Sequence, residues 1–331
     1  MNITEKYIDF DSHKIYTKLF SNNSKILLLM GTGNAIGTRA LYDYQLHDRE
    51  GTIAEYLCNN GVDVLLMDAV GYGNSIGLKI GWEYNRNYYA KQIVEVAKTI
   101  TPNYNKTIIF GYCSTTAQTL ISSLSGLFDK IIIHSPSIFY PEGDPETFNS
   151  SNQQWVNKVK WWNDERIPAL YRYFLEKKSP KAMGVRRLKT GLYFGSAELM
   201  IKNRITQTSE KLIPKSNLTP NITERIECVI NGFTNRSPES GGWFTQLHMT
   251  EDLYRYPVVF KNHGYNFNDI RIPEIFSIYG QYDVEYLSKS NGFNKFIKPK
   301  AETVIENSTH WSFMENNYLK TLATIIDYCK Q

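Results

Sequence analysis

The chain contains 331 residues, of which 42% are hydrophobic and 21% are charged, as in ordinary globular proteins with a sizeable core. Its net charge of +4 is small for this length, which predicts no nucleic-acid partner. The amino terminus is polar and no apolar run approaches the roughly 18 residues of a membrane helix, so we expect a cytoplasmic protein without membrane insertion.

The first 138 residues alternate between predicted strands and predicted helices. Apolar, β-branched runs predict the strands, and apolar residues at helical spacing or runs without breakers predict the helices. The strands are predicted at residues 7–10, 14–20, 25–30, 62–67, 107–110 and 130–134, and the helices at 51–60, 82–101 and 114–120. This alternation predicts an α/β fold with a mostly parallel, doubly wound sheet and helices on both faces.

A glycine-rich turn, Gly31 to Gly37, follows the strand at 25–30 and permits two interpretations. In a dinucleotide-binding unit the glycines would admit a pyrophosphate, and Asp68 after the next strand would hold a ribose. The third glycine falls one position late, however, and the gap from Gly31 to Asp68 exceeds the usual separation of about 20 to 30 residues. We therefore predict no nucleotide cofactor, and indeed no cofactor of any kind.

The strand at 107–110 turns directly into the helix that begins at Ser114, with Cys113 at the apex. Such an apex is crowded and needs small residues on both sides, which Gly111 and Thr115 supply. The apex side chain should be exposed above the sheet, where the following helix amino terminus favours a thiolate. Two alternatives remain open: Cys113 as a buried structural cysteine, and Ser114 as the nucleophile, although Tyr112 stands where a small residue would be needed.

Alternation stops in the middle of the chain, and aromatic residues gather there instead. A stretch this long between two core strands is too large for a loop, so we expect a largely helical inserted lid at 139–270, between core segments 1–138 and 271–331. Within it, Lys177 to Lys189 is densely basic. This basic stretch is either a solvated face or a surface for an acidic carrier protein.

Two polar residues follow the last predicted strands. Asp283 comes shortly after the strand at 272–279, and His310 lies between a short strand at 304–305 and a closing helix at 319–329. The four cysteines are scattered and form neither a CxxC pair nor a Cys/His cluster at metal spacing, which argues against a disulfide framework and a zinc site.

These motifs resemble the α/β-hydrolase family. The turn at 111–115 is similar to its nucleophile elbow, G-x-S-x-G, with Cys in place of Ser and Thr in place of the second Gly, and residues 68–75 match its D-x-x-G-x-G-x-S turn. The resemblance implies a triad of Cys113, Asp283 and His310 in the family's chain order. It also implies an oxyanion hole formed by the backbone N–H groups of Ser114 and Thr32, with Gly33 as the alternative to Thr32, and a structural role for Asp68.

The expected chemistry is acyl transfer through an acyl-cysteine intermediate. Forming an acyl-cysteine from an oxygen ester or amide is uphill, whereas forming it from another thioester is nearly neutral. The expected substrate is therefore an acyl thioester, carried on coenzyme A or a carrier protein, and the enzyme a thioesterase or acyltransferase. Alternatives are a carboxylesterase-type hydrolase of small esters or lactones and a noncatalytic binding protein of the same fold.

Overall fold

The structure is a computed structural model of the whole chain. It describes residues 1–31, 39–43, 45, 50–70, 74–75, 86–136, 264–266, 271–281, 283, 293–308, 312–313, 315 and 317–331. The predicted lid at 139–270, including the basic stretch, therefore lies almost wholly outside the described residues, and so do Thr32, Gly33 and His310.

Eight strands form one sheet in the order β1-β2-β4-β3-β5-β6-β7-β8. They are β1 (Asn2–Phe10), β2 (His13–Ser21), β3 (Ile26–Met30), β4 (Asp63–Met67), β5 (Lys106–Tyr112), β6 (Lys130–His134), β7 (Glu274–Gly280) and β8 (Ala301–Ile305). Strand β2 runs antiparallel to both of its neighbours, and every pairing from β4 to β8 is parallel. The predicted mostly parallel sheet is thus confirmed.

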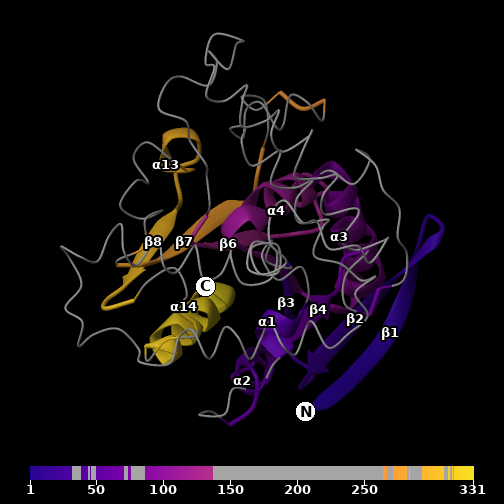
Figure 1. The fold of residues 1–331 in the computed structure, drawn as a ribbon, viewed down its shortest axis with the longest axis horizontal. Coiled ribbons are helices and arrows are strands. Elements are labelled where there is room, and N and C mark those ends of the chain that lie inside the picture. Colours follow the sequence, from indigo (N-terminus) through magenta and orange to yellow (C-terminus); the bar gives the residue numbers. More distant parts are fainter. Residues whose placement is uncertain are drawn as a thin grey trace, which may run out of the picture.

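Helices cover both faces of this sheet, as Figure 1 shows. One face packs against α3 (Arg86–Ile100) and α4 (Thr116–Ser123), and the other against α1 (Ala40–Asp43), α2 (Ile53–Asn59) and α14 (Tyr318–Lys330). Alternate residues of the strands point to opposite faces, so each interior strand contributes to both hydrophobic clusters. For example, Ile109 packs on the α3 and α4 side, while Ile108 packs on the α2 and α14 side.

Several elements differ from the sequence prediction. Strand β1 begins at Asn2 rather than Tyr7, and β8 begins at Ala301 rather than Val304, because backbone pairing with β2 and β7 extends these two edge strands through polar residues. The one-turn helices α1 and α13 (Phe293–Phe296) are too short to show helical periodicity and were not predicted. The helix predicted from Ser114 begins instead with a single 3₁₀ turn, η2 (Cys113–Thr115).

The parallel strands place the candidate residues at one edge of the sheet. Cys113 directly follows β5, and Asp283 comes three residues after the end of β7. Strands β6 and β7 lie side by side although residues 135–273 separate them in sequence, and Ser135 N–H donates to Ile278 O at 2.8 Å beside this pairing. The carboxyl edge of β5 to β8 is where open α/β sheets bind their ligands.

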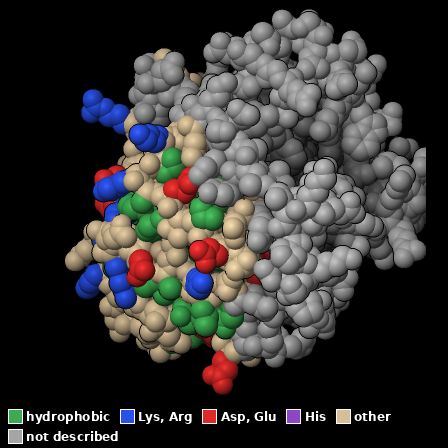
Figure 2. Space-filling model, turned by 90° about the vertical axis from the view of Figure 1, so that its left-hand side faces the viewer, with side chains coloured by type: hydrophobic (Ala, Val, Ile, Leu, Met, Phe, Trp, Pro, Cys, Tyr) green, Lys and Arg blue, Asp and Glu red, His purple; other side chains and the backbone are tan. Residues whose placement is uncertain are grey.

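The described surface carries charges of both signs. Figure 2 shows Lys, Arg, Asp and Glu side chains interspersed on the side of the molecule nearest β8, where Lys300 Nζ lies 2.5 Å from Glu274 Oε1.

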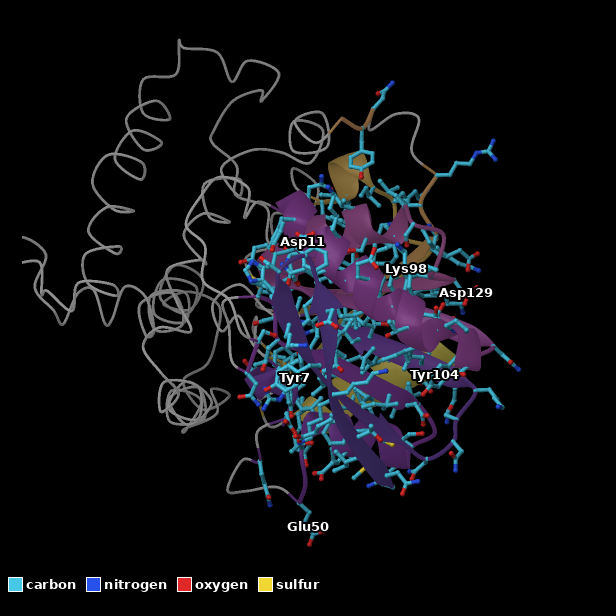
Figure 3. The ribbon with its side chains drawn as sticks, turned by 90° about the vertical axis from the view of Figure 1, so that its right-hand side faces the viewer. Tyr7, Asp11, Glu50, Lys98, Tyr104 and Asp129 are labelled. Atoms are coloured by element: carbon cyan, nitrogen blue, oxygen red, sulfur yellow. The ribbon has the colours of Figure 1, made fainter. Side chains whose placement is uncertain are left out.

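On the opposite side, a cavity of about 650 Å³ lies between the β1–β2 turn, α3 and α4, and is lined in part by Asp11 and Lys98, labelled in Figure 3. None of the predicted site residues lines it. Within the described ranges, no helix has the length and apolar character needed to cross a membrane.

Candidate active site

The predicted strand–turn–helix around Cys113 is confirmed. Strand β5 ends at Tyr112, η2 covers Cys113 to Thr115, and α4 starts at Thr116. Cys113 itself has a φ of +56°, in the left-handed region that side-chain-bearing residues seldom adopt. A non-glycine residue in this conformation stores strain, and such strain clusters at active sites and ligand clamps.

Hydroxyl groups hold the backbone of this elbow. Thr115 Oγ1 accepts a hydrogen bond from Tyr112 N–H at 2.9 Å and lies 2.8 Å from Tyr112 O, to which it donates. Thr116 Oγ1 donates to Cys113 O at 2.6 Å. Thr115 adopts ordinary helical angles, with φ −74° and ψ −6°, so no glycine is required there for conformational reasons. The departure from the second glycine of the motif is therefore compatible with the elbow geometry.

Gly111 lets α4 approach β5 closely. A Cβ atom added at Gly111 would lie 2.6 Å from Thr119 Oγ1 and 3.0 Å from Thr119 Cβ, both far inside normal contact. Because Thr119 is on the buried side of α4 with no exposed surface, it has little room to move away. The small residue before the apex is thus required by helix packing.

We expect Gly111→Ala to lower the free energy of unfolding by about 1 to 3 kcal/mol, because the added methyl group overpacks the contact with Thr119. Urea unfolding of the purified variant measures this loss. The double variant Gly111→Ala, Thr119→Ala removes the nearest atom and should recover part of it. Equal destabilisation of the single and double variants would show that the strain lies elsewhere in the elbow.

Cys113 is only 5% exposed, so the expectation of an exposed apex side chain is wrong for this structure. It belongs to the hydrophobic cluster that also holds Tyr42, Phe110, Tyr112 and Phe313. Apolar side chains from α1 and from the segment before α14 therefore cover the end of β5. The sequence did not indicate this cover, because it comes from residues distant along the chain.

The other described cysteines are structural. Burial raises the pKa of Cys58 to about 11 and that of Cys329 to about 12, so both stay protonated at neutral pH. Neither they nor Cys113 forms a disulfide. Within the described part of the chain, no group of three or more His, Cys, Asp and Glu side chains could hold a metal ion.

Asp283 is fully buried in the turn that follows β7. Its N–H donates to Gly280 O at 3.0 Å, which closes the turn. The adjacent Gln281 links this turn to the one after β8: its N–H donates to Ile305 O at 2.9 Å, and its Oε1 accepts from Asn307 N–H at 2.9 Å. The turn that carries Asp283 is therefore hydrogen-bonded to Asn307, three residues before His310 in sequence.

His134, at the end of β6, forms a hydrogen bond with Ser312, which follows His310 in sequence. Its Nε2 lies 2.7 Å from Ser312 Oγ, which in turn accepts a hydrogen bond from Thr321 Oγ1 of α14 at 3.0 Å. The neighbouring Phe313 packs edge-on against the ring of Tyr112, with ring centroids 4.9 Å apart. Of the described residues that flank His310 in sequence, Phe313 thus lies next to the elbow, and Asn307 lies beside the turn after β7.

Asp68 organises loop backbone, as expected. It has no exposed surface, and its carboxylate accepts hydrogen bonds from the N–H groups of Arg39 and Asn74, each at 2.9 Å, and pairs with the Arg39 guanidinium. Ser75 Oγ donates to Asp68 O at 2.5 Å and accepts from Tyr16 N–H at 2.8 Å. With its carboxylate engaged in this way, Asp68 is not available to a ribose, and the dinucleotide interpretation loses its acidic residue.

The structure thus brings Cys113, the backbone of Ser114 and Asp283 to the carboxyl edge of the sheet, while Thr32 and His310 lie outside the described residues. The sequence prediction missed the roles of Gln281 and His134 in fastening the surrounding turns. Only the position of each at the carboxyl end of a predicted strand, His134 as its last residue and Gln281 two residues beyond it, could have drawn attention to it.

The comparisons with known proteins establish the fold. No family model and no curated protein matches the chain. Among solved structures, it is similar to the esterase EaEST from Exiguobacterium antarcticum, with 15% identity, a TM-score of 0.59 and coverage of 99% of this chain and 100% of the esterase. It is also similar to epoxide hydrolase I of potato (Solanum tuberosum), with 13% identity, a TM-score of 0.57 and coverage of 99% of each chain. The thioesterase domain from the curacin biosynthetic pathway has 11% identity and a TM-score of 0.56, with coverage of 100% of each chain. The chain has the α/β-hydrolase fold.

Proposed function

We propose that this chain is an acyl-transfer enzyme in which Cys113 is the nucleophile, His310 the general base and Asp283 the acid that orients His310. The observation that carries the proposal is the left-handed conformation of Cys113, at φ +56°, on the turn between an interior strand and a helix. Strain of this kind fixes a side chain above the sheet edge, and the fully buried Asp283 lies at the same edge.

The position of His310 in the chain supports its role. Asn307 is tied to Gln281, and Ser312 to His134, so both flanks of His310 are held at the carboxyl edge. In the proposed reaction, His310 accepts the thiol proton of Cys113.

In the proposed reaction, His310 takes the proton of Cys113 and the thiolate attacks the acyl carbon. A carbon–sulfur bond forms while the carbonyl π electrons move onto oxygen, and the backbone N–H groups of Ser114 and Thr32 stabilise the resulting oxyanion. Collapse restores the carbonyl and breaks the bond to the donor thiolate, which receives the proton from His310. Water, an amine or an alcohol then accepts the acyl group by the same steps in reverse order.

The proposed donor is an acyl thioester, because exchange of one thiolate for another is nearly neutral in free energy. Coenzyme A and a carrier protein are the two candidate thiols. A carrier protein would bring an acidic surface, for which the basic stretch Lys177–Lys189 is the proposed partner surface.

The test is mass spectrometry of the intact protein after incubation with a panel of acyl thioesters, followed by peptide mapping. We expect the mass of one acyl group on the peptide that contains Cys113. Cys58 and Cys329 serve as internal controls, since their raised pKa values keep them protonated and unreactive. Acylation from oxygen esters alone would instead favour the carboxylesterase alternative.

A noncatalytic binding protein of the same fold remains the second candidate, because Cys113 is only 5% exposed. In that case Cys113 would be an inert member of the hydrophobic cluster. Iodoacetamide at neutral pH distinguishes the two: a catalytic thiolate should be alkylated rapidly in the folded protein, and an inert thiol only after denaturation.

Gln281 offers a test of the proposed pairing between Asp283 and His310. Gln281→Ala removes the acceptor for Asn307 N–H and loosens the link between the two turns, so we expect turnover to fall roughly 10- to 100-fold with the fold retained. The loss should appear in kcat more than in KM, because the variant loosens the proposed catalytic groups and leaves the substrate contacts in place. Gln281→Glu keeps an acceptor oxygen and should retain more activity. Wild-type kcat in Gln281→Ala would contradict this role.

A further inference from the structure

Tyr42 on α1 carries a buried hydroxyl group without a hydrogen-bond partner. The side chain is 1% exposed, and among the described residues no group forms a hydrogen bond with its hydroxyl oxygen. The ring is enclosed by aromatic neighbours, edge-on against Phe110 at 6.0 Å between centroids and tilted against Phe313 at 6.4 Å. Burying a phenol without a partner costs free energy, so such a group requires an explanation.

Tyr42 lies at the end of β5 that carries the candidate nucleophile. Its ring contacts Phe110 of β5, and Phe313 contacts both Tyr42 and Tyr112, the residue before Cys113. Burial raises the pKa of Tyr42 above its ordinary value, and the negative charge of a Cys113 thiolate raises it further. Tyr42 therefore remains a protonated donor throughout the neutral range.

Ion pairs hold the helix that carries Tyr42 in place. Helix α1 has only four residues and could not hold its orientation alone. Arg39, just before it, pairs with the buried Asp68 and, through Nε at 3.2 Å, with Asp43 of α1. Lys18 of β2 adds a second cation to Asp43 at 2.8 Å. These ion pairs fix α1 at the carboxyl edge of the sheet.

A preorganised donor of this kind is suited to stabilising an oxyanion, because no reorganisation is needed when charge develops. We propose that the Tyr42 hydroxyl donates a hydrogen bond to the acyl oxygen of the substrate as Cys113 attacks, which makes it a side-chain member of the oxyanion hole. This inference rests on the proposed function. No proton is transferred: the oxygen accepts the hydrogen bond while the carbon–sulfur bond forms, and the bond weakens when the carbonyl is restored.

The test compares wild type, Tyr42→Phe and the control Tyr104→Phe. Tyr104 precedes β5 at the opposite edge of the sheet, where its hydroxyl donates to Asp63 Oδ2 at 3.0 Å. Each protein is mixed with S-(4-nitrophenyl) thioacetate, and the rate of acetyl-Cys113 formation is followed by quenched mass spectrometry. Iodoacetamide alkylation of Cys113 is measured in parallel, because this displacement forms no oxyanion.

We expect Tyr42→Phe to slow acetylation roughly 100-fold while iodoacetamide alkylation stays at the wild-type rate. The melting temperature should be equal to or above that of wild type, since the variant removes an unpartnered polar group. Tyr104→Phe should acetylate normally.

Three results would overturn the inference. Acetylation of Tyr42→Phe at the wild-type rate would reject the role of Tyr42 and leave the proposed function intact. Equal slowing of acetylation and alkylation would show that Tyr42 acts on the thiol of Cys113 rather than on the oxyanion. If wild-type Cys113 is alkylated but never acetylated by any thioester of the panel, the proposed function fails and the inference with it.

Discussion

Cys113→Ala is expected to abolish acyl-enzyme formation and to lower turnover of an acyl thioester by about 10⁶-fold, the scale of loss when the nucleophile of a serine-protease triad is removed. The physical reason is that the φ of +56° places this one side chain at the apex of the elbow. Intact mass measurement shows the loss of the adduct, and initial rates show the loss of turnover. The truncation removes one small side chain from the cluster with Phe110 and Tyr112 and should leave the fold intact.

Two companion variants make the Cys113 result specific. Ser114→Ala should retain most of the activity, because Ser114 is proposed to contribute its backbone N–H and not its hydroxyl. Cys113→Ser should fold but be strongly impaired, since a hydroxyl depends far more on His310 for activation than a thiol does. Loss of the adduct in Ser114→Ala with retention in Cys113→Ala would move the nucleophile to Ser114.

Asp283→Asn should keep the fold and lower turnover by about 10⁴-fold, the loss that the same change causes in a serine-protease triad. The neutral amide favours the wrong tautomer of His310 and cannot stabilise its charged form. Because Asp283 is fully buried, the substitution by a side chain of equal size is the appropriate one. Initial rates with a saturating thioester measure the effect, and circular dichroism checks the fold.

Glu285 is the control for this assignment, since it is the other acidic residue shortly after β7. Glu285→Gln should be close to wild type. Near-normal turnover in Asp283→Asn together with loss of turnover in Glu285→Gln would transfer the acidic role to Glu285.

The sequence predicted the elements of the fold correctly where buried apolar residues produce a clear hydrophobic pattern. Strand β6 has the predicted bounds, Lys130–His134, because a run of isoleucines buried on both faces leaves little ambiguity. Strand β1 was predicted too short, since Asn2 to Lys6 are exposed and held by backbone pairing with β2. Helix α1 has no periodicity to detect, and its position depends on ion pairs with Lys18 and Asp68 that no local pattern indicates.

The parts of the candidate site that are local in sequence could be predicted, and the parts that depend on distant residues could not. The elbow could be inferred from Gly111 and Cys113, because strand, turn and helix are consecutive there. The burial of Cys113 could not, since its hydrophobic cluster includes Tyr42 and Phe313, which lie far away in the chain. The unpartnered hydroxyl of Tyr42 was likewise invisible in the sequence, because a missing hydrogen bond is a property of the packed core alone.

The direct pairing of β6 with β7 has a consequence for biosynthesis (Figure 1). A ribosome adding 5 to 20 residues per second makes β7 roughly 7 to 30 s after β6, because about 140 residues separate them. Until β7 is made, its side of β6, which carries Ile131, Ile132 and Ile133, lacks the strand that pairs with it in the complete sheet, and unpaired strand edges recruit other chains. Nascent chains that have emerged only as far as the middle of the sequence are therefore the species most in need of a chaperone, and slowing translation there lengthens their exposure.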